Sequence, residues 1–165
     1  MLTSEALLQI HERAHCNLKG YLTHCRALDV EAFDRTMPEF GGASVRLQLH
    51  HAIGAERYWI AVLQGRVDAD DDAHLYPTIE SLEGYRETTF DATQAYLRSA
   101  SREELNTPRP MRTWKNEEHV LHPGHVVMRT ITHVYHHQGQ IASMLRMLGS
   151  PSPGFNYPIG KVVVD

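Results

Sequence analysis

Histidine is the residue of this sequence whose number and spacing could support chemistry. The chain contains 12 histidines among 165 residues, several times the usual share of a soluble protein. A neutral imidazole is the commonest metal ligand among side chains, although histidine also serves as an ordinary surface residue. What matters is therefore which histidines the fold would turn inward and bring together.

Two histidines near the C-terminus share one face of an expected helix. His133 and His137 are four positions apart in a segment with helical periodicity, so their side chains are neighbours on the helix surface. The same stripe carries Gln140 and Met144, next to an apolar stripe, whereas His136 falls on a polar face. We therefore expect His133 and His137 to point inward and His136 to lie in solvent.

A tandem pair of histidines occurs in an earlier helical segment. His50 and His51 must point about 100° apart on a helix, so only one of them can face the core directly. His51 lies on an apolar stripe with Leu47 and Tyr58, and His50 shares a face with Arg46. Periodicity therefore predicts that His51 points inward and His50 outward.

Three inward imidazoles on two helices need partners for their nitrogens. A buried polar atom without a hydrogen bond costs about 1–3 kcal/mol, and a bound metal ion removes that cost for one nitrogen of each ring. Three neutral imidazoles suit a divalent ion of zinc, nickel or iron and leave a coordination position for water or substrate. The sequence thus predicts a metal site formed by His51, His133 and His137, and it assigns no further catalytic residue.

A competing pattern occurs near the N-terminus, where residues 11–15 read HERAH. In zinc proteases, H-E-x-x-H supplies two zinc ligands and a catalytic base. We disfavour a protease because the pattern is short, no sheet can precede it, and His11 and His15 sit at the flank of the expected apolar stripe. A ferritin-like di-iron centre is also disfavoured, since Glu12 and His15 form half of its signature and no second half occurs. The role of this segment stays open.

Four segments with helical periodicity must position these histidines, and turn signals separate them. The expected helices run from about residue 3 to 28, 44 to 64, 78 to 100 and 122 to 149. The connection 101–121 contains Pro108 and Pro110 and is expected to be irregular or a short hairpin. We predict an all-α fold, a four-helix bundle with a long crossover connection before the last helix. Residues 1–165 are expected to form a single domain, with 150–165 as a loop-like C-terminal tail.

Composition and charge argue against several classes of protein. Hydrophobic residues make up 42% and charged residues 22% of the chain, as in an ordinary soluble domain. A net charge of −4 without a basic cluster argues against nucleic acid as a partner. The first residues have neither a basic start nor an uninterrupted apolar run, so we expect no signal peptide, no membrane helix and a cytoplasmic location. Cys16 and Cys25 fall on opposite sides of the first helix and are expected to be free thiols.

Two segments that contain the selected histidines resemble the motifs of a known family. Residues 51–59 read HAIGAERYW, and residues 133–141 read HVYHHQGQI. These resemble the second-helix and last-helix motifs of the DinB-like (DinB/YfiT) superfamily of metal-binding four-helix bundles. The resemblance implies the ligands His51, His133 and His137, a bundle with a long crossover, frequent homodimers, and zinc or nickel as the metal.

The resemblance implies a looser conclusion about activity. Characterised relatives include transferases and isomerases that act with low-molecular-weight thiols, whereas many members have no known activity. The leading hypothesis is therefore a metal-dependent transferase that binds a small thiol at the open metal position, where Gln140 could orient a ligand. The alternatives are a metal-dependent hydrolase, for which Glu56 points away from His51 and supplies no base, and a non-enzymatic, metal-binding dimeric stress protein.

Overall fold

The four long helices begin where the sequence supplies a capping residue or a proline. The structure is a computed structural model that describes residues 1–41, 43–67 and 72–154. Its long helices are α1 (Ser4–Cys25), α3 (Val45–Leu63), α4 (Ile79–Ser99) and α6 (Pro123–Met147). Thr3, Ser44 and Thr78 each accept a backbone N–H of the first helical turn, and Pro123 occupies the first position of α6. All four helices lie within a few residues of their expected bounds.

Short elements fill the connections between the long helices. Two single-turn helices and two helices of five residues were not predicted, because a hydrophobic period cannot show itself in so few residues. They are α2 (Val30–Asp34), η1 (Pro38–Phe40), η2 (Ala73–Leu75) and α5 (Arg102–Asn106). Residues 150–154 are loop, as expected, and the rest of the expected tail, 155–165, lies outside the described residues.

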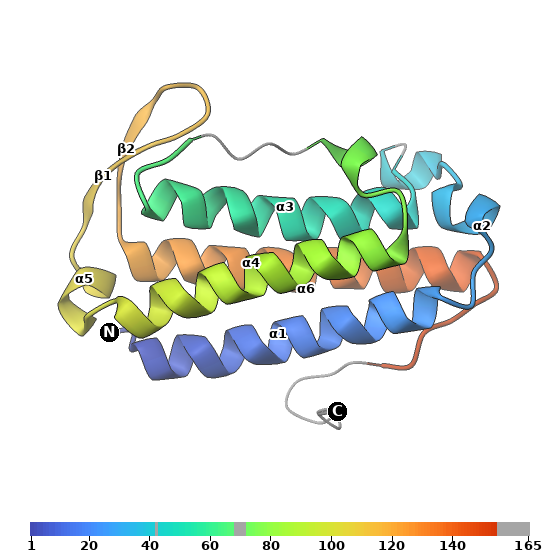
Figure 1. Ribbon diagram of the computed structural model, residues 1–165, viewed down its shortest axis with the longest axis horizontal. Helices are drawn as coiled ribbons and strands as arrows, with labels where there is room; N and C mark the ends of the chain where they lie inside the picture. Colours follow the sequence, from blue (N-terminus) through green and yellow to red (C-terminus); the bar gives the residue numbers. More distant parts are fainter. Residues whose placement is uncertain (42, 68–71, 155–165) are drawn as a thin grey trace.

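The connection before the last helix ends in a β-hairpin. Strand β1 (Arg109–Arg112) pairs with β2 (Glu118–Leu121) in antiparallel register, with Arg112 opposite Glu118. Asn116 adopts a left-handed φ of 56° in the turn between them. The hairpin stands over the end of the molecule where α3 ends and α6 begins (Figure 1). The structure is thus mostly helical, as expected, with this small sheet as the exception.

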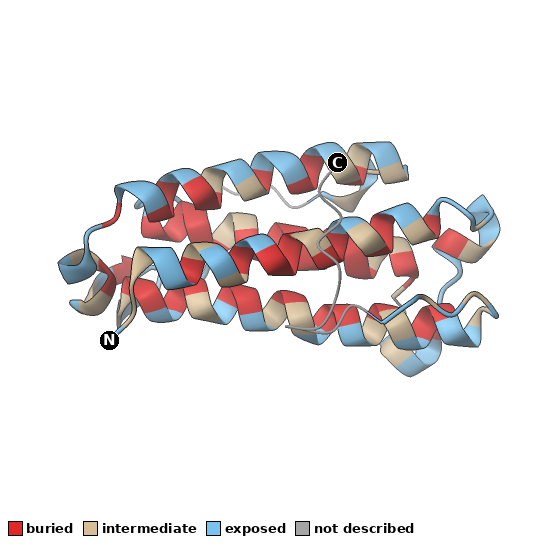
Figure 2. Ribbon diagram, turned by 90° about the horizontal axis from the view of Figure 1, so that it is seen from below, coloured by how far each residue is buried: buried red, intermediate tan, exposed pale blue. Residues whose placement is uncertain are grey.

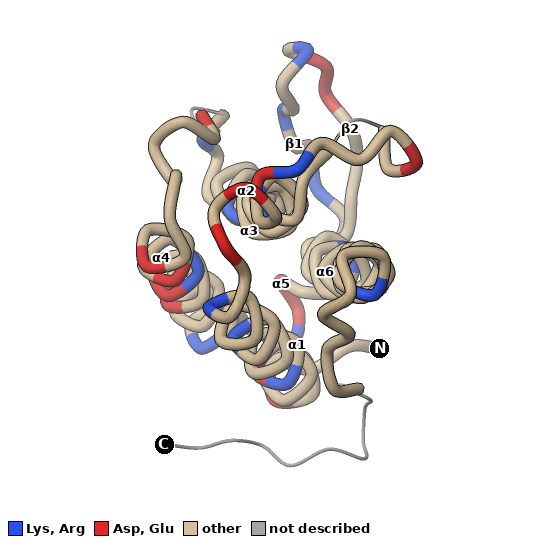
Figure 3. The backbone as a smooth tube through the Cα atoms, turned by 90° about the vertical axis from the view of Figure 1, so that its right-hand side faces the viewer, with Lys and Arg blue, Asp and Glu red and all other residues tan. Residues whose placement is uncertain are grey.

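Each long helix packs against two neighbours around a shared core. Helix α3 packs on α4 and α6, and α1 packs on the other sides of the same two helices, as the end-on view shows (Figure 3). The inner sides are buried and the outer sides exposed (Figure 2). The core includes fully buried Leu18, Leu49, Leu97 and Ile141. No helix in the described ranges has the length and apolar character needed to cross a membrane.

The chain direction places α3 beside α6 as antiparallel neighbours. The colours of Figure 1 show that α3 and α4 run the same way and that α1 and α6 run the opposite way. Helices α4 and α6 both pack on α1 and α3, so the long connection between α4 and α6 joins opposite corners of the molecule (Figure 3). The sequence did not predict that α3 and α4 run in the same direction. The antiparallel seam between α3 and α6 holds the histidines considered next.

Candidate metal centre

The structure brings together the three histidines that the sequence singled out. His51 projects from α3, and His133 and His137 project from α6, with one ligand nitrogen of each within 4.8 Å of the others. The Nε2 atoms of His133 and His137 are 3.2 Å apart. The ring of His51 lies 4.7 Å from that of His137 and 5.2 Å from that of His133, measured between centroids. The three rings thus converge from two helices on one point.

The spacing and the hydrogen bonds of these rings fit a metal ion. Two imidazole nitrogens on a tetrahedral zinc ion, at about 2.0–2.1 Å each, would be about 3.3–3.4 Å apart, close to the observed 3.2 Å between His133 and His137. The Nδ1 of His137 lies 2.7 Å from the amide oxygen of Gln48. An amide oxygen can only accept, so Nδ1 carries the proton and Nε2 presents a lone pair. The buried Nδ1 of His133 has no hydrogen-bond partner in the described part of the chain.

Burial keeps two of the three rings neutral. Burial lowers the pKa of both His133 and His137 to about 4. The neighbouring ring of His51 adds to this effect on His133, and the ring of His133 adds to it on His137. Neutral imidazoles are the form that binds a metal ion. At neutral pH, both rings of α6 are therefore ready to act as ligands.

One side of the three-histidine cluster is open. His137 is buried, His133 is half-buried and His51 is exposed. A cavity of about 290 Å³ adjoins the exposed side and is lined by His51, His133, Tyr58 and Trp59, among others. A small molecule can therefore reach the cluster from solvent.

The burial of the tandem histidines is the reverse of what periodicity predicted. His50, expected outside, is only 4% exposed and packs against the rings of Tyr76 and Tyr85, whereas His51, expected inside, is exposed. Helix α3 has neighbours on two sides, so its buried arc is wider than one apolar stripe. His50 faces the α4 side, and His51 lies at the outer edge of the seam with α6. His136 is exposed, as predicted.

A second cluster joins the N-terminal histidines to a glutamate of another helix. His11 and His15 of α1 place their Nε2 atoms 2.8 and 2.9 Å from the two carboxylate oxygens of Glu56 on α3. Thr93 of α4 donates its hydroxyl to the same carboxylate at 2.6 Å. The expectation that His11 and His15 lie at the flank of the core was wrong, because both are buried. Glu56 does point away from His51, as expected.

Hydrogen bonds determine where the protons of this second cluster lie. Arg98 donates to the Oε1 of Gln94 at 3.0 Å, so the amide NH₂ of Gln94 faces the Nδ1 of His11, 3.1 Å away. Nδ1 of His11 is then the acceptor, and its Nε2–H donates to Glu56. To bind a metal, the Nε2 of His11 would have to carry no proton. The cluster has ligand types and spacing that could bind a metal. However, the proton on the Nε2 of His11 is used in a hydrogen bond to Glu56.

The charge state of the second cluster agrees with these protons. Burial alone would raise the pKa of Glu56, but the charges and hydrogen bonds of His15 and His11 outweigh it and hold the pKa well below its ordinary range. Burial lowers the pKa of His15 despite the nearby carboxylate. The carboxylate of Glu56 is therefore ionised. Glu12, the middle residue of the H-E-x-x-H pattern, is exposed and stands apart from this arrangement.

Sequence reasoning missed several residues around the two clusters. Gln48 precedes His51 by three positions, a spacing that places both on one side of a helix, but nothing in the sequence connects it to His137. The pairing of Glu56 with α1 also carries no local signal. Gln140, proposed as a ligand-orienting residue, is half-buried, and its buried Oε1 has no hydrogen-bond partner among the residues described.

Comparison with known proteins identifies a family. The model of the family described as DinB matches residues 4–162, nearly the whole chain. A search of curated proteins found no match.

Proposed function

Because the chain belongs to the DinB family, we propose that it is a divalent-metal-binding protein whose ligands are His51, His133 and His137. The observation that carries this proposal is the pair of Nε2 atoms 3.2 Å apart, one of them on a ring whose Nδ1–H is held by Gln48. That arrangement presents two ligand nitrogens from α6 close to the ring of His51 on α3. The second cluster is the weaker candidate for the metal site, because the Nε2 atoms of His11 and His15 already donate to Glu56.

The activity we propose is transfer of a low-molecular-weight thiol to an electrophilic carbon. A divalent ion of zinc, nickel or iron held by the three histidines would lower the pKa of a thiol bound to it. In the transfer, the thiol proton leaves to solvent, the sulfur forms a bond to the carbon, and a leaving group departs with its electron pair. The exposed side of His51 and the adjoining cavity give a small thiol access to the cluster from solvent.

Features of the site favour this activity over the two alternatives. A hydrolase needs a general base near the metal, and among the described residues no carboxylate belongs to the three-histidine group. Glu56 is committed to the second cluster instead. A non-enzymatic metal protein would favour a closed site, whereas a cavity adjoins this one.

Elemental analysis and a transfer assay test the proposal together. We expect near-stoichiometric metal in the parent protein and in His136→Ala, the matched control on the same helix, but not in His133→Ala or His137→Ala. Metal loss on His11→Ala, with His133→Ala unaffected, would move the site to the second cluster.

The thiol step is tested on metal-loaded protein, including a cobalt-substituted form. Glutathione, bacillithiol and mycothiol are each supplied with 1-chloro-2,4-dinitrobenzene, from which chloride leaves as the carbon–sulfur bond forms. We expect at least one thiol to change the cobalt spectrum and to form a conjugate faster than without enzyme. If no thiol does either, the transferase proposal is wrong even where the metal is bound.

The proposal extends to the form of the molecule. We propose that the four long helices are the four-helix bundle of the family, in a single domain that acts as a cytoplasmic homodimer. Cytoplasmic thiols stay reduced, which suits both a thiol substrate and the two free cysteines, Cys16 and Cys25. Light scattering after gel filtration would return twice the mass of the chain, and a monomer mass would overturn the dimer.

A further inference from the structure

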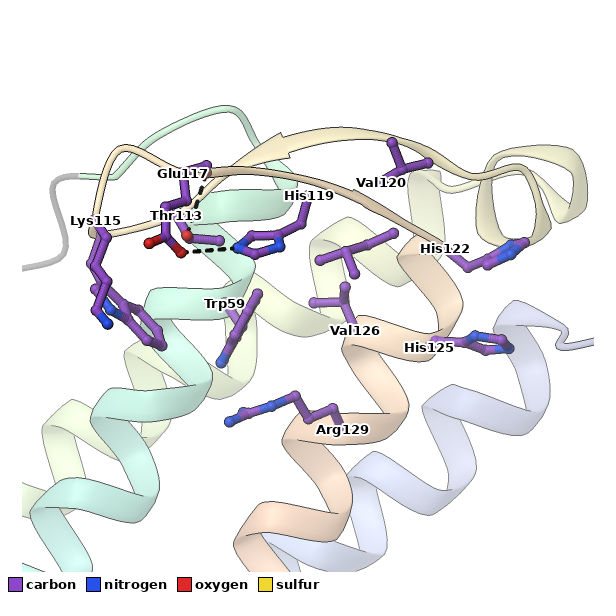
Figure 4. A pocket seen from close by; sticks show the side chains of 12 residues that line it. Trp59, Thr113, Lys115, Glu117, His119, Val120, His122, His125, Val126 and Arg129 are labelled. Carbon is purple, nitrogen blue, oxygen red and sulfur yellow. Dashed lines mark hydrogen bonds and ion pairs between the residues drawn. The ribbon is translucent and has the colours of Figure 1, made fainter.

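A groove beside the three-histidine cluster has features of a ligand pocket. The cavity at His51 and His133 shares Trp59, Trp114 and Arg129 with a larger cavity of about 620 Å³ beneath the hairpin. Figure 4 shows the larger cavity between the hairpin, α3 and the first turns of α6. Its volume lies in the range typical of small-molecule sites. A ligand that extends from the larger into the smaller cavity would lie beside His51 and His133.

One wall of the groove is aromatic and held in place. The rings of Tyr58, Trp59 and Trp114 lie with centroids 5.0 to 6.0 Å apart. The backbone N–H of Trp114 donates to the hydroxyl of Tyr58 at 2.8 Å, which fixes the hairpin turn against α3. The Trp114 side chain nevertheless stays 62% exposed. A large, positioned ring with a solvent-facing surface is suited to stacking a planar ligand.

The groove also holds a cation that has no acidic partner in the described part of the chain. Arg129 lies one helical turn before His133, and its guanidinium is 4.8 Å from the centre of a Trp59 ring. No carboxylate of the described residues forms an ion pair with Arg129. The nearby acid, Glu117, is 3.4 Å from His119 instead. Arg129 is therefore positioned at the groove with hydrogen-bond donors that no described carboxylate occupies, and a guanidinium is suited to binding an anion.

We propose that this groove binds the electrophilic substrate and selects a small aromatic carboxylate. Arg129 binds the carboxylate, and Trp114 stacks on the planar ring. This inference rests on the proposed function, because it places the second reactant beside the site where the thiol would bind. It adds the substrate class and two specificity-determining residues to that function.

Ligand binding can be followed directly, because both tryptophans of the chain line the groove. Benzoate and trans-cinnamate, each beside its neutral amide, are titrated into metal-loaded protein and into chelator-treated protein. Tryptophan emission and calorimetry report binding. We expect each acid to bind at least about tenfold more tightly than its amide, with or without metal. Cyclohexanecarboxylate, which is not planar, should bind more weakly than benzoate.

Two variants separate the two contacts, and a third serves as their control. Arg129→Gln should bind acid and amide equally while keeping the affinity of the parent for the amide. Trp114→Leu, followed by calorimetry, should abolish the preference for benzoate over cyclohexanecarboxylate. Arg146→Gln, an exposed arginine near the other end of α6, is the matched control and should bind as the parent does.

The proposal is overturned if acids and amides bind equally to the parent, or if Arg129→Gln keeps the preference for acids. It is also overturned if neither acid binds at millimolar concentration. If the preference for acids is lost on removal of the metal but persists in Arg129→Gln, the carboxylate binds the metal and not Arg129. These outcomes are independent of thiol transfer, because no thiol is present: a failed transfer assay beside intact acid binding rejects only the transferase.

Discussion

At the scale of single residues, one amide determines which nitrogen of His137 is free to bind a metal at the proposed site. Gln48 accepts the Nδ1–H of His137 at 2.7 Å, and this bond leaves Nε2 without a proton. In the second cluster, the amide of Gln94 donates to the Nδ1 of His11 and puts the proton on Nε2. The amide oxygen of Gln48 thus leaves the Nε2 of His137 free to bind a metal. The amide NH₂ of Gln94 instead makes the Nε2 of His11 a hydrogen-bond donor.

Replacing Gln48 should weaken metal binding without abolishing it. Gln48→Leu keeps the size of the buried side chain but removes the acceptor that orients His137. We expect metal affinity to fall by about 10–100-fold, measured by competition with a chromophoric chelator. Gln64→Leu, at the exposed end of the same helix, should match the parent. Equal affinity of Gln48→Leu and the parent would show that Gln48 does not orient the ligand.

At the scale of elements, Glu56 connects three helices. Its carboxylate receives hydrogen bonds from His11 and His15 of α1 and from Thr93 of α4, and it belongs to α3 itself. All of these side chains are buried. The network therefore ties α1, α3 and α4 together, while the three-histidine cluster bridges α3 and α6. Between them, the two clusters link all four long helices.

The Glu56 network predicts that stability falls in acid. The pKa of Glu56 is lower in the folded protein than in the unfolded chain, so its contribution is complete above a pH of about 4.5 and is lost as the pH falls below it. The lowered pKa of His15 acts in the same direction below a pH of about 6.5, because the unfolded chain takes up the proton first. The free energy of unfolding should therefore decrease from pH 7 toward pH 4.

Glu56→Gln tests this contribution in urea unfolding with a chelator present, so that metal loss does not contribute. We expect the variant to be about 2 kcal/mol less stable at pH 7, since His15 can shift its proton to Nδ1 and recover part of the network. Its stability should also depend less on pH below about 4.5. Glu12→Gln, an exposed acid on α1, is the control and should behave as the parent. A parent-like pH profile for Glu56→Gln would contradict the ionised state of Glu56.

At the scale of the whole molecule, a metal ion would connect parts of the chain that are far apart in sequence. His51 and His137 are separated by 86 positions, and α3 and α6 meet along an antiparallel seam that the hairpin covers at one end (Figure 1). An ion held by both helices binds only the folded chain. Its affinity therefore adds to the stability of the entire fold.

Added zinc should raise the melting temperature of the protein, and a chelator should reverse the rise. At a free zinc concentration 100 times the dissociation constant, the gain is about 2.7 kcal/mol, or about 5–10 °C for a chain of this length. Scanning fluorimetry of His137→Ala should show no such rise, and His136→Ala should respond as the parent. An unchanged response in His137→Ala would place the stabilising ion elsewhere.

The sequence by itself determined the helices and the histidines of the candidate site. Helix bounds followed from capping residues, prolines and periodicity, which act within a few residues along the chain. His133 and His137 followed from a spacing of four, which a helix converts into proximity without any tertiary contact. The family motifs pointed to the same histidines, together with His51.

Only the tertiary structure decided which helix sides are buried and which distant residues meet. Periodicity placed His51 inside and His50 outside, but neighbours on two sides of α3 bury His50 and leave His51 at the edge of the seam. No role for Glu56 was evident from the sequence, because its partners His11 and His15 lie more than 40 positions away on another helix. The groove between the hairpin and Arg129 likewise depends on packing. Local patterns determine a face of one helix, whereas the position of the other helices determines what that face meets.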